Sequence, residues 1–333
     1  MPAVALAKAL IALLVSLLIP ALLDGARSLA NAEPDDDQAF TVAVLRRDGV
    51  LIPFANHRRG RWSNDWPEPG KPFDVPITLD DVPDEWWGHS TPVTAWTLWR
   101  FQGNSHQVRA TVPARYPAQC LPGFGFRTDY RSDEPVPPPT ERPHPKDGLA
   151  TSASARVEKV EILDERAPEW SDLQQRIAPA FAEVEREVVR RFSKWNHPAT
   201  ASERERMPVR IEQLYRVPLR GAGELYYVEA SRAYDDPSQK DDCDAVTLVS
   251  GWVRPWRPAD KVFDLSAVIT LCDRADATYV LPLGLIRPSG DRSPVWVLQV
   301  AGWDVEHYVA VETGRDANRI LVSAFGGSCP RDP

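Results

Sequence analysis

The sequence has few cysteines, few methionines and no apolar run long enough to cross a membrane. Four cysteines and two methionines occur in 333 residues. The apolar run from Ala9 to Leu23 falls short of the ~20 residues that a membrane-spanning helix needs, and Pro20 interrupts it. A polytopic membrane protein is therefore excluded.

Short catalytic motifs are also missing. The sequence contains no G-x-S-x-G, H-E-x-x-H, C-x-x-C or phosphate-binding loop. Enzyme classes that depend on these motifs are excluded. A hydrolase that works through paired carboxylates is not, because such a pair leaves no local signature.

An excess of basic charge is absent as well. The chain has 39 Lys and Arg residues against 47 Asp and Glu residues, a formal net charge of -8. This mild acidity, with both signs interspersed, argues against nucleic acid or an anionic membrane surface as the partner. Proline and tryptophan, by contrast, are abundant at 32 and 12 residues. That many prolines disfavour an all-helical bundle.

The N-terminal segment has the features of an export signal. Lys8 precedes the apolar run, and Ala30-Asn31-Ala32 forms an A-x-A cleavage site. We expect a signal peptide over 1–32, cleaved after Ala32, and a secreted or periplasmic protein of bacterial origin with no membrane span in the mature chain. The alternative is that this segment is kept as an anchor.

Proline clustering divides the rest of the chain. Segment 132–154 holds six prolines and a Ser/Ala-rich stretch, a composition typical of a semi-rigid linker. We therefore expect a Trp/Pro-rich β domain over 33–131 and a second domain over 155–333. In the first domain, Asp48-Gly49 between short alternating segments predicts a β-hairpin.

The second domain begins with a helix and continues with strands. Apolar residues spaced three or four apart predict an amphipathic helix at about 168–195. Eight strand candidates follow at about ten-residue intervals, without intervening helices. They cover 208–217, 223–232, 245–253, 262–271, 278–286, 294–301, 305–312 and 318–323. The predicted fold is mainly β: the small strand domain, then an antiparallel meander, barrel-like or sandwich sheet packed on the helix.

The cysteines suggest disulfides, because the expected compartment is oxidising. They are Cys120, Cys243, Cys272 and Cys329, which allow three pairings. Pairing Cys243 with Cys272 aligns 245–253 with 262–271 so that Leu248 faces Ala267 and most apolar residues share one face. We therefore predict Cys243–Cys272, which leaves Cys120–Cys329.

Two sets of acidic residues are site candidates. The first is a loop cluster of Asp235, Asp236, Asp241, Asp242 and Asp244. Carboxylates on a loop suit Ca²⁺, but the calcium-loop spacing is absent, so we interpret the cluster as a solvated turn and expect no metal or other cofactor. The second set is Asp304 and Glu306, which could form an acid/base pair with Glu229 or Arg232 if their strands are neighbours. The alternative is a salt bridge on the face of a barrel. We expect His307, which lies among valines, to be a core residue.

Tryptophan supplies the binding candidates. Trp62, Trp66, Trp86 and Trp87 lie close together in the first domain, and exposed indole rings suit sugars or a protein partner. We interpret the tryptophans mainly as the core of a small strand domain, and a binding surface is the alternative.

The function predicted from these features is that of an exported, non-catalytic protein that binds a glycan or a cell-envelope protein. The first alternative is an exported hydrolase that uses the carboxylates of the second domain. The second is a structural component of a surface assembly. The sequence does not indicate an oligomeric state.

Overall fold

The computed structural model describes residues 39–88, 92–100, 105–138, 141, 144–152, 155–194, 197–219, 223–235, 243–254, 265–272, 274, 277–288, 293–302, 304–314 and 318–329. The expected signal peptide over 1–32 lies outside these residues. The described chain is mainly β, as predicted, and its main strand pairings are antiparallel.

The N-terminal part forms a closed barrel with one further strand. Its strands are β1 (Phe40–Arg46), β2 (Val50–Arg58), β3 (Arg61–Ser63), β4 (Ala95–Trp99), β5 (Ser105–Ala118), β6 (Leu121–Thr128) and β7 (Lys146–Thr151). They run in the order β1-β7-β4-β5-β6-β2-β3, and a β1–β2 pairing closes the ring. The predicted hairpin at Asp48-Gly49 joins β1 to β2, and Gly49 takes the positive φ of 80° that the turn requires. A short 3₁₀ helix, η2 (Leu79–Asp81), and the helix α2 (Asp84–Trp87) lie between β3 and β4.

The linker prediction needs correction. Residues 146–151, inside the segment expected to link two domains, form β7, which pairs with β1 and with β4. The barrel therefore takes one strand from beyond the proline cluster. Composition misled the prediction because the proline cluster extends to Pro145, directly before β7, whereas all of β7 is buried.

Two more sheets complete the molecule. The C-terminal sheet has the order β17-β16-β15-β14-β8, and the helix-covered sheet has the order β13-β12-β11-β10-β9. The strands of the C-terminal sheet are β8 (Arg156–Glu158), β14 (Tyr279–Arg287), β15 (Val295–Ala301), β16 (Val305–Thr313) and β17 (Asn318–Ser328). Those of the helix-covered sheet are β9 (Glu161–Leu163), β10 (Arg210–Leu219), β11 (Gly223–Asp235), β12 (Cys243–Val253) and β13 (Ser266–Thr270).

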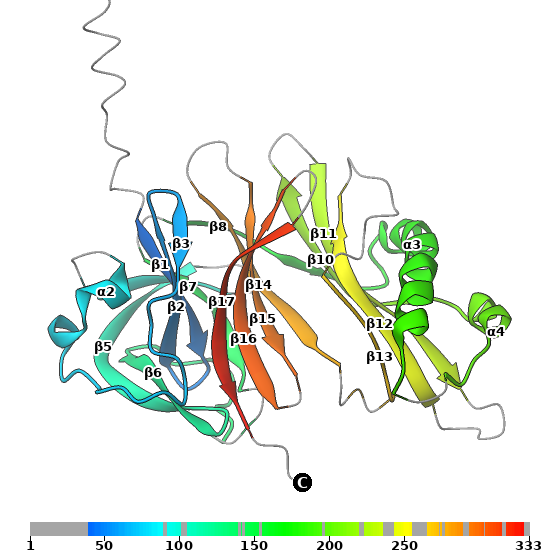
Figure 1. The fold of residues 1–333 in the computed structure, drawn as a ribbon. Helices are drawn as coiled ribbons and strands as arrows, with labels where there is room; N and C mark the ends of the chain where they lie inside the picture. The colour runs from blue at the N-terminus through cyan, green and yellow to red at the C-terminus, as the bar shows by residue number, and fades with distance from the viewer. Residues whose placement is uncertain are drawn as a thin grey trace, which may run out of the picture.

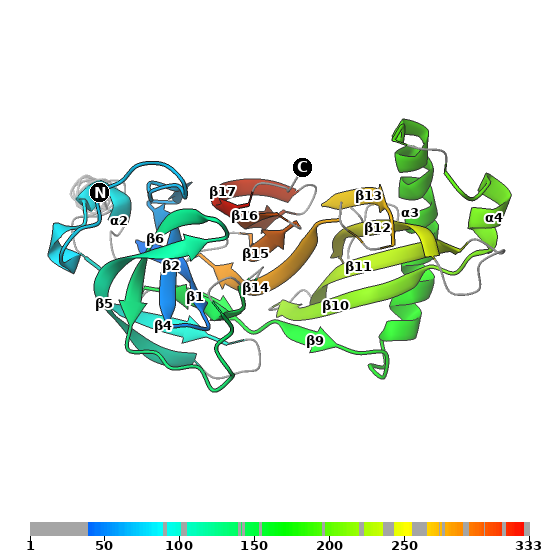
Figure 2. The same cartoon turned by 90° about the horizontal axis from the view of Figure 1, so that it is seen from below.

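The C-terminal sheet lies in the middle of the molecule (Figure 1, Figure 2). One core cluster joins it to the outer wall of the barrel through side chains such as Val44 and Val297. A second joins it to the helix-covered sheet, where Trp252 lies near Trp296. Because its inner strands are covered on both faces, they read as continuous apolar runs rather than as alternating patterns.

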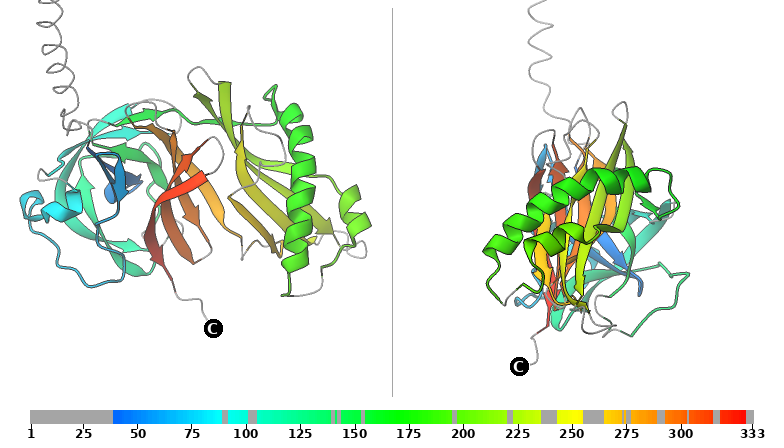
Figure 3. Two further views of the ribbon diagram at one scale, coloured as in Figure 1. Left: turned by 45° about the horizontal axis from the view of Figure 1, so that its top comes forward. Right: turned by 90° about the vertical axis from the view of Figure 1, so that its right-hand side faces the viewer.

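The predicted helix is α3 (Trp170–Arg191), and it covers the outer face of its sheet (Figure 3). Its apolar stripe, which includes Ile177 and Phe181, packs against the sheet, and Pro179 lies inside the helix without ending it. Buried Glu185 on the same face pairs with Arg232 and accepts a hydrogen bond from the Tyr234 hydroxyl. A short second helix, α4 (Ala201–Arg206), was not predicted; Thr200 and Glu203 form its capping box.

The structure contains the predicted disulfide between Cys120 and Cys329. Cys272 is also disulfide-bonded, whereas the side chain of Cys243 lies outside the described residues. The Cys243–Cys272 prediction was based on a hairpin register that was wrong by one residue, because Leu248 pairs with Val268 instead of Ala267. Since β12 is buried on both faces, its apolar pattern does not determine the register.

Within the described residues, no helix has the length and apolarity needed to cross a membrane.

Removing the Cys120–Cys329 disulfide should destabilise the protein, because the bond joins residues that are 209 positions apart. The variant with both cysteines changed to Ser should lose about 2–5 kcal/mol of unfolding free energy in chemical denaturation. A loss below about 0.5 kcal/mol would show that noncovalent contacts alone hold the C-terminal strand in place.

Candidate binding site at the barrel junction

A buried ion pair joins the barrel to the C-terminal sheet. Lys146 of β7 and Glu306 of β16 are 2.8 Å apart, with side chains only 2% and 4% exposed. The Lys146 ammonium also donates to the carbonyl of His144 at 2.7 Å, while Glu306 accepts from the Tyr308 hydroxyl and, at 3.3 Å, from the Gln119 amide. Burial lowers the pKa of Lys146, and the negative charge of Glu306 opposes that shift. Both charged groups of the pair therefore have further hydrogen-bond partners.

Main-chain contacts bring the end of β17 against the barrel beside this pair. The amide of Cys120 donates to the carbonyl of Ser328 at 3.1 Å, and that of Cys329 donates to the carbonyl of Asp304 at 2.8 Å. Gly327 has a φ of 122°, and a Cβ there would lie 2.3 Å from the Ala118 carbonyl oxygen. The backbone at position 327 therefore lies too close to the Ala118 carbonyl for any residue other than glycine.

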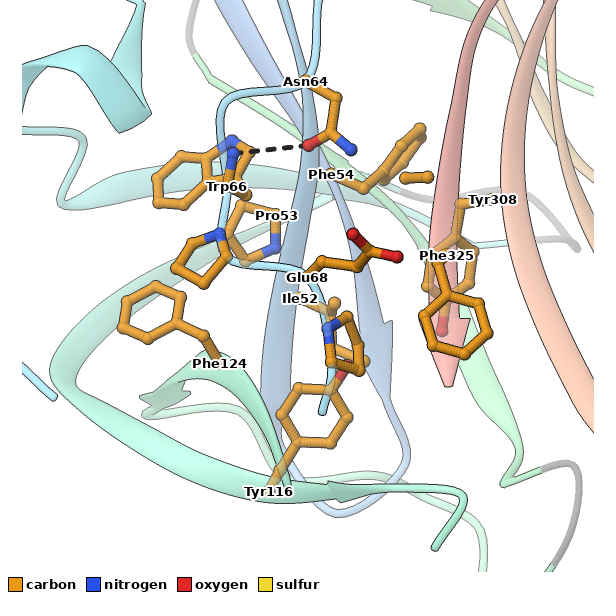
Figure 4. Close-up of a pocket in the computed structure, with 13 residues that line it drawn as sticks. Ile52, Pro53, Phe54, Asn64, Trp66, Glu68, Tyr116, Phe124, Tyr308 and Phe325 are labelled. Carbon is orange, nitrogen blue, oxygen red and sulfur yellow. Dashed lines mark hydrogen bonds between the residues drawn. The ribbon is translucent and has the colours of Figure 1, made fainter. Parts of the chain in front are cut away.

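A hollow opens where the loop after β3 faces β16 and β17. We call it the junction hollow. Its outer part has a cavity volume of about 440 Å³ and is lined by Asn64, Asp65, Trp66, Glu68, Lys71, His307, Ser323 and Phe325. Its inner part, of about 20 Å³, shares four of these residues and is otherwise lined by Ile52, Pro53, Phe54, Pro67, Pro69, Tyr116, Phe124, Tyr308 and Ala324 (Figure 4).

The loop that forms one wall is held in a single shape. Trp66 is 7% exposed and packs in the barrel core, with its ring 4.9 Å from that of Trp87. Pro67 and Pro69 restrict the backbone on either side of Glu68. The amide of Gly70 then donates to the carbonyl of Pro122 at 3.0 Å. Glu68 is therefore presented from a rigid support.

The opposite wall comes from two adjacent strands. The rings of His307 on β16 and Phe325 on β17 have centroids 5.5 Å apart, and both residues are partly exposed. Burial lowers the pKa of His307, so its ring is neutral at pH 7. The expectation that His307 is a core residue was wrong, because the side chain lines the hollow.

The predicted tryptophans take different positions. Trp87 is fully buried and Trp66 nearly so, both in the barrel core. Trp86 is partly buried against the same core, and Trp62, the middle residue of β3, has its ring centroid 5.7 Å from that of Phe40. Only Trp66 of the four lines the junction hollow.

The predicted carboxylates do not form one site. Glu306 belongs to the buried ion pair, and Asp304 immediately precedes β16. Glu229 is on β11 in a different sheet, so the strands of the proposed acid/base pair are not neighbours. Arg232, the other suggested partner, pairs with Glu185 instead.

Glu229 is nevertheless in an unusual environment between the two sheets. It accepts hydrogen bonds from the Tyr227 hydroxyl at 2.9 Å and from the Val280 amide of β14 at 3.3 Å. Burial raises its pKa from 4.5 to about 7, although these hydrogen bonds and the charge of Arg274 act in the opposite direction. Glu229 is thus a titrating group within the contact between the sheets.

The aspartate cluster is not placed. Asp236, Asp241 and Asp242 lie outside the described residues, as do the side chains of Asp235 and Asp244. Among the side chains that are described, no group of three or more His, Cys, Asp or Glu residues is arranged to hold a metal ion.

Sequence reasoning missed most of the hollow. Asn64, Asp65, Glu68, Lys71, Ser323 and Phe325 were not proposed as site residues. One local signal was available: Trp66-Pro67-Glu68-Pro69-Gly70 combines an anchoring indole with two prolines, which is typical of a rigid surface loop. Nothing local indicated that β17 would face it, because the two segments are far apart in sequence.

Breaking the ion pair from one side should cost more than removing both charges. Lys146→Met leaves the Glu306 carboxylate buried without its cation and should lower the unfolding free energy by about 3–5 kcal/mol in urea titrations. Adding Glu306→Gln should recover at least half of the unfolding free energy that Lys146→Met removes. Lys71→Met, at a lysine whose side chain is 70% exposed, is the matched control and should change stability by less than about 0.5 kcal/mol. If the double variant lost the sum of the stability losses of the two single variants, the two charges would not stabilise each other.

Glu229 should make stability depend on pH. Its raised pKa means that the folded state holds a proton which the unfolded state releases between pH 4.5 and 7. Stability is therefore full below pH 4.5 and falls as pH rises through 7, by up to about 3 kcal/mol relative to Glu229→Gln. Denaturation curves at pH 4.5 and 7.5 measure this, with Glu205→Gln on an exposed helix position as control. If the stability difference between the native protein and Glu229→Gln were the same at both pH values, the raised pKa of Glu229 would be refuted.

No protein-family model, curated protein or solved structure matches the chain, so the function is argued from the site itself.

Proposed function

We propose that the protein is an exported, non-catalytic binding protein whose ligand is a saccharide held in the junction hollow. The observation that carries this proposal is the outer cavity of about 440 Å³, which combines aromatic rings with hydrogen-bonding side chains. Its volume falls within the ~300–1,000 Å³ range of small-molecule sites.

The chemistry of the two walls suits a sugar. A sugar ring has apolar C–H faces and a rim of hydroxyl groups, so it needs both flat apolar contacts and polar partners. Phe325 and His307 supply ring surface from one wall. Asn64, Asp65 and Ser323 supply amide, carboxylate and hydroxyl groups that accept or donate hydrogen bonds.

The rigidity of the loop supports binding without a large ordering cost. Trp66 is fixed in the barrel core and prolines flank Glu68, so little conformational freedom remains to be lost when a ligand binds. The proposal therefore differs from the sequence-based one, in which tryptophan rings themselves contact the ligand. Of the tryptophans, Trp66 acts as an anchor of the binding loop, and Trp87 is a core residue.

The disulfides support an exported protein. Such bonds persist in oxidising compartments and are rare in the cytosol. The Cys120–Cys329 bond and the bonded state of Cys272 fit this compartment, as does the signal-like segment at 1–32.

Replacing Phe325 with Ala should weaken saccharide binding. The ring provides a contact surface in the hollow, so we expect a loss of about tenfold in affinity for the best ligand found on a glycan array, measured by calorimetry. Ile320→Ala is the matched control, since Ile320 lies on the same strand, is 62% exposed and does not line the hollow. Affinity that falls equally in both variants, or a native protein that binds no glycan, would refute the proposal.

A further inference from the structure

We propose that the bound saccharide carries a primary ammonium group, and that Glu68 holds this group at the inner end of the junction hollow. The inference rests on the proposed function and adds the chemical class of the ligand. An amino sugar with a free, unacetylated amine is the ligand that fits.

The inner part of the hollow is lined by aromatic side chains and by one carboxylate, that of Glu68, whose side chain is 42% exposed. Its aromatic lining consists of Phe54, Trp66, Tyr116, Phe124, Tyr308 and Phe325. Among the described residues that line it, Glu68 alone is charged. Figure 4 shows the Glu68 carboxylate in the middle of this group, directed toward Tyr308 and Phe325.

This combination favours a cation. Aromatic ring faces carry a negative electrostatic potential that attracts ammonium groups. A carboxylate partly shielded from water forms a stronger, charge-assisted hydrogen bond with an ammonium than with a neutral hydroxyl. An anionic sugar such as a uronic acid would instead be repelled by Glu68.

The size of the inner part favours an unsubstituted amine. A cavity measure of about 20 Å³ corresponds to roughly one water molecule, since a single water needs ~10–15 Å³ by the same measure. An ammonium group fits that space, whereas an acetamido group does not. The sugar ring itself would lie in the outer part, which is about twenty times larger.

The ligand ammonium would replace an existing cation. Glu68 forms an ion pair with Lys71, whose side chain is 70% exposed and pays little to swing into solvent. Lys146 lies beyond Tyr308 and is already compensated by Glu306. Among the described residues that line the hollow, Lys71 is therefore the one lysine or arginine that competes for Glu68.

The test compares three β-1,4-linked tetrasaccharides by calorimetry at pH 6, where amino sugars are largely protonated: the glucosamine tetramer, the N-acetylglucosamine tetramer and cellotetraose. The glucosamine tetramer should bind at least about tenfold more tightly than the other two, as expected for a hydrogen bond to a charged group. Glu68→Gln should abolish this preference, so that the glucosamine tetramer binds no more tightly than cellotetraose. Lys71→Ala should raise the affinity for the glucosamine tetramer, because it removes the competing cation.

Glu85→Gln is the matched control, since it removes the same charge from an exposed position on α2 outside the hollow. Thermal melting of each variant checks that it is folded. Equal affinity for all three tetramers, or a preference that survives Glu68→Gln, would overturn the inference while leaving saccharide binding intact. Failure to bind any glycan on the array or any of the tetramers would refute the proposed function as well.

Discussion

The relative position of the barrel and the C-terminal sheet depends on the buried ion pair between Lys146 and Glu306. Each charge would be costly in these apolar surroundings without the other, so the two elements are stable together in the arrangement that pairs them. The Cys120–Cys329 bond and the close approach at Gly327 act at the same junction. Together these contacts determine where the end of β17 lies on the barrel wall.

That position creates the junction hollow. One wall is the loop anchored by Trp66 in the barrel core, and the other is the surface of β16 and β17 that carries His307 and Phe325. Neither wall alone encloses a cavity, so the hollow is a product of the junction. The same arrangement sets Glu68 among aromatic rings, which gives the hollow its proposed preference for a cation (Figure 4).

The sequence predicted the elements better than their partners. The helix at 170–191 was predictable because only one of its faces is apolar, and most strands are separated by clear turn signals. β7 was missed because it directly follows the proline cluster, and the register of β12 was missed because both faces of that strand are buried. Most of the site could not be predicted from the sequence. Whether the Trp66 ring is exposed or anchors the loop in the core depends on contacts between segments distant in the sequence.

Hydrogen–deuterium exchange with and without the glucosamine tetramer tests the central claim most directly, that one ligand contacts both walls of the junction. We predict slower exchange in two separate segments, 64–71 and 318–325, with little change in α3 or in the helix-covered sheet. Protection of only one of the two segments, or protection centred on another part of the molecule, would contradict this account of the site.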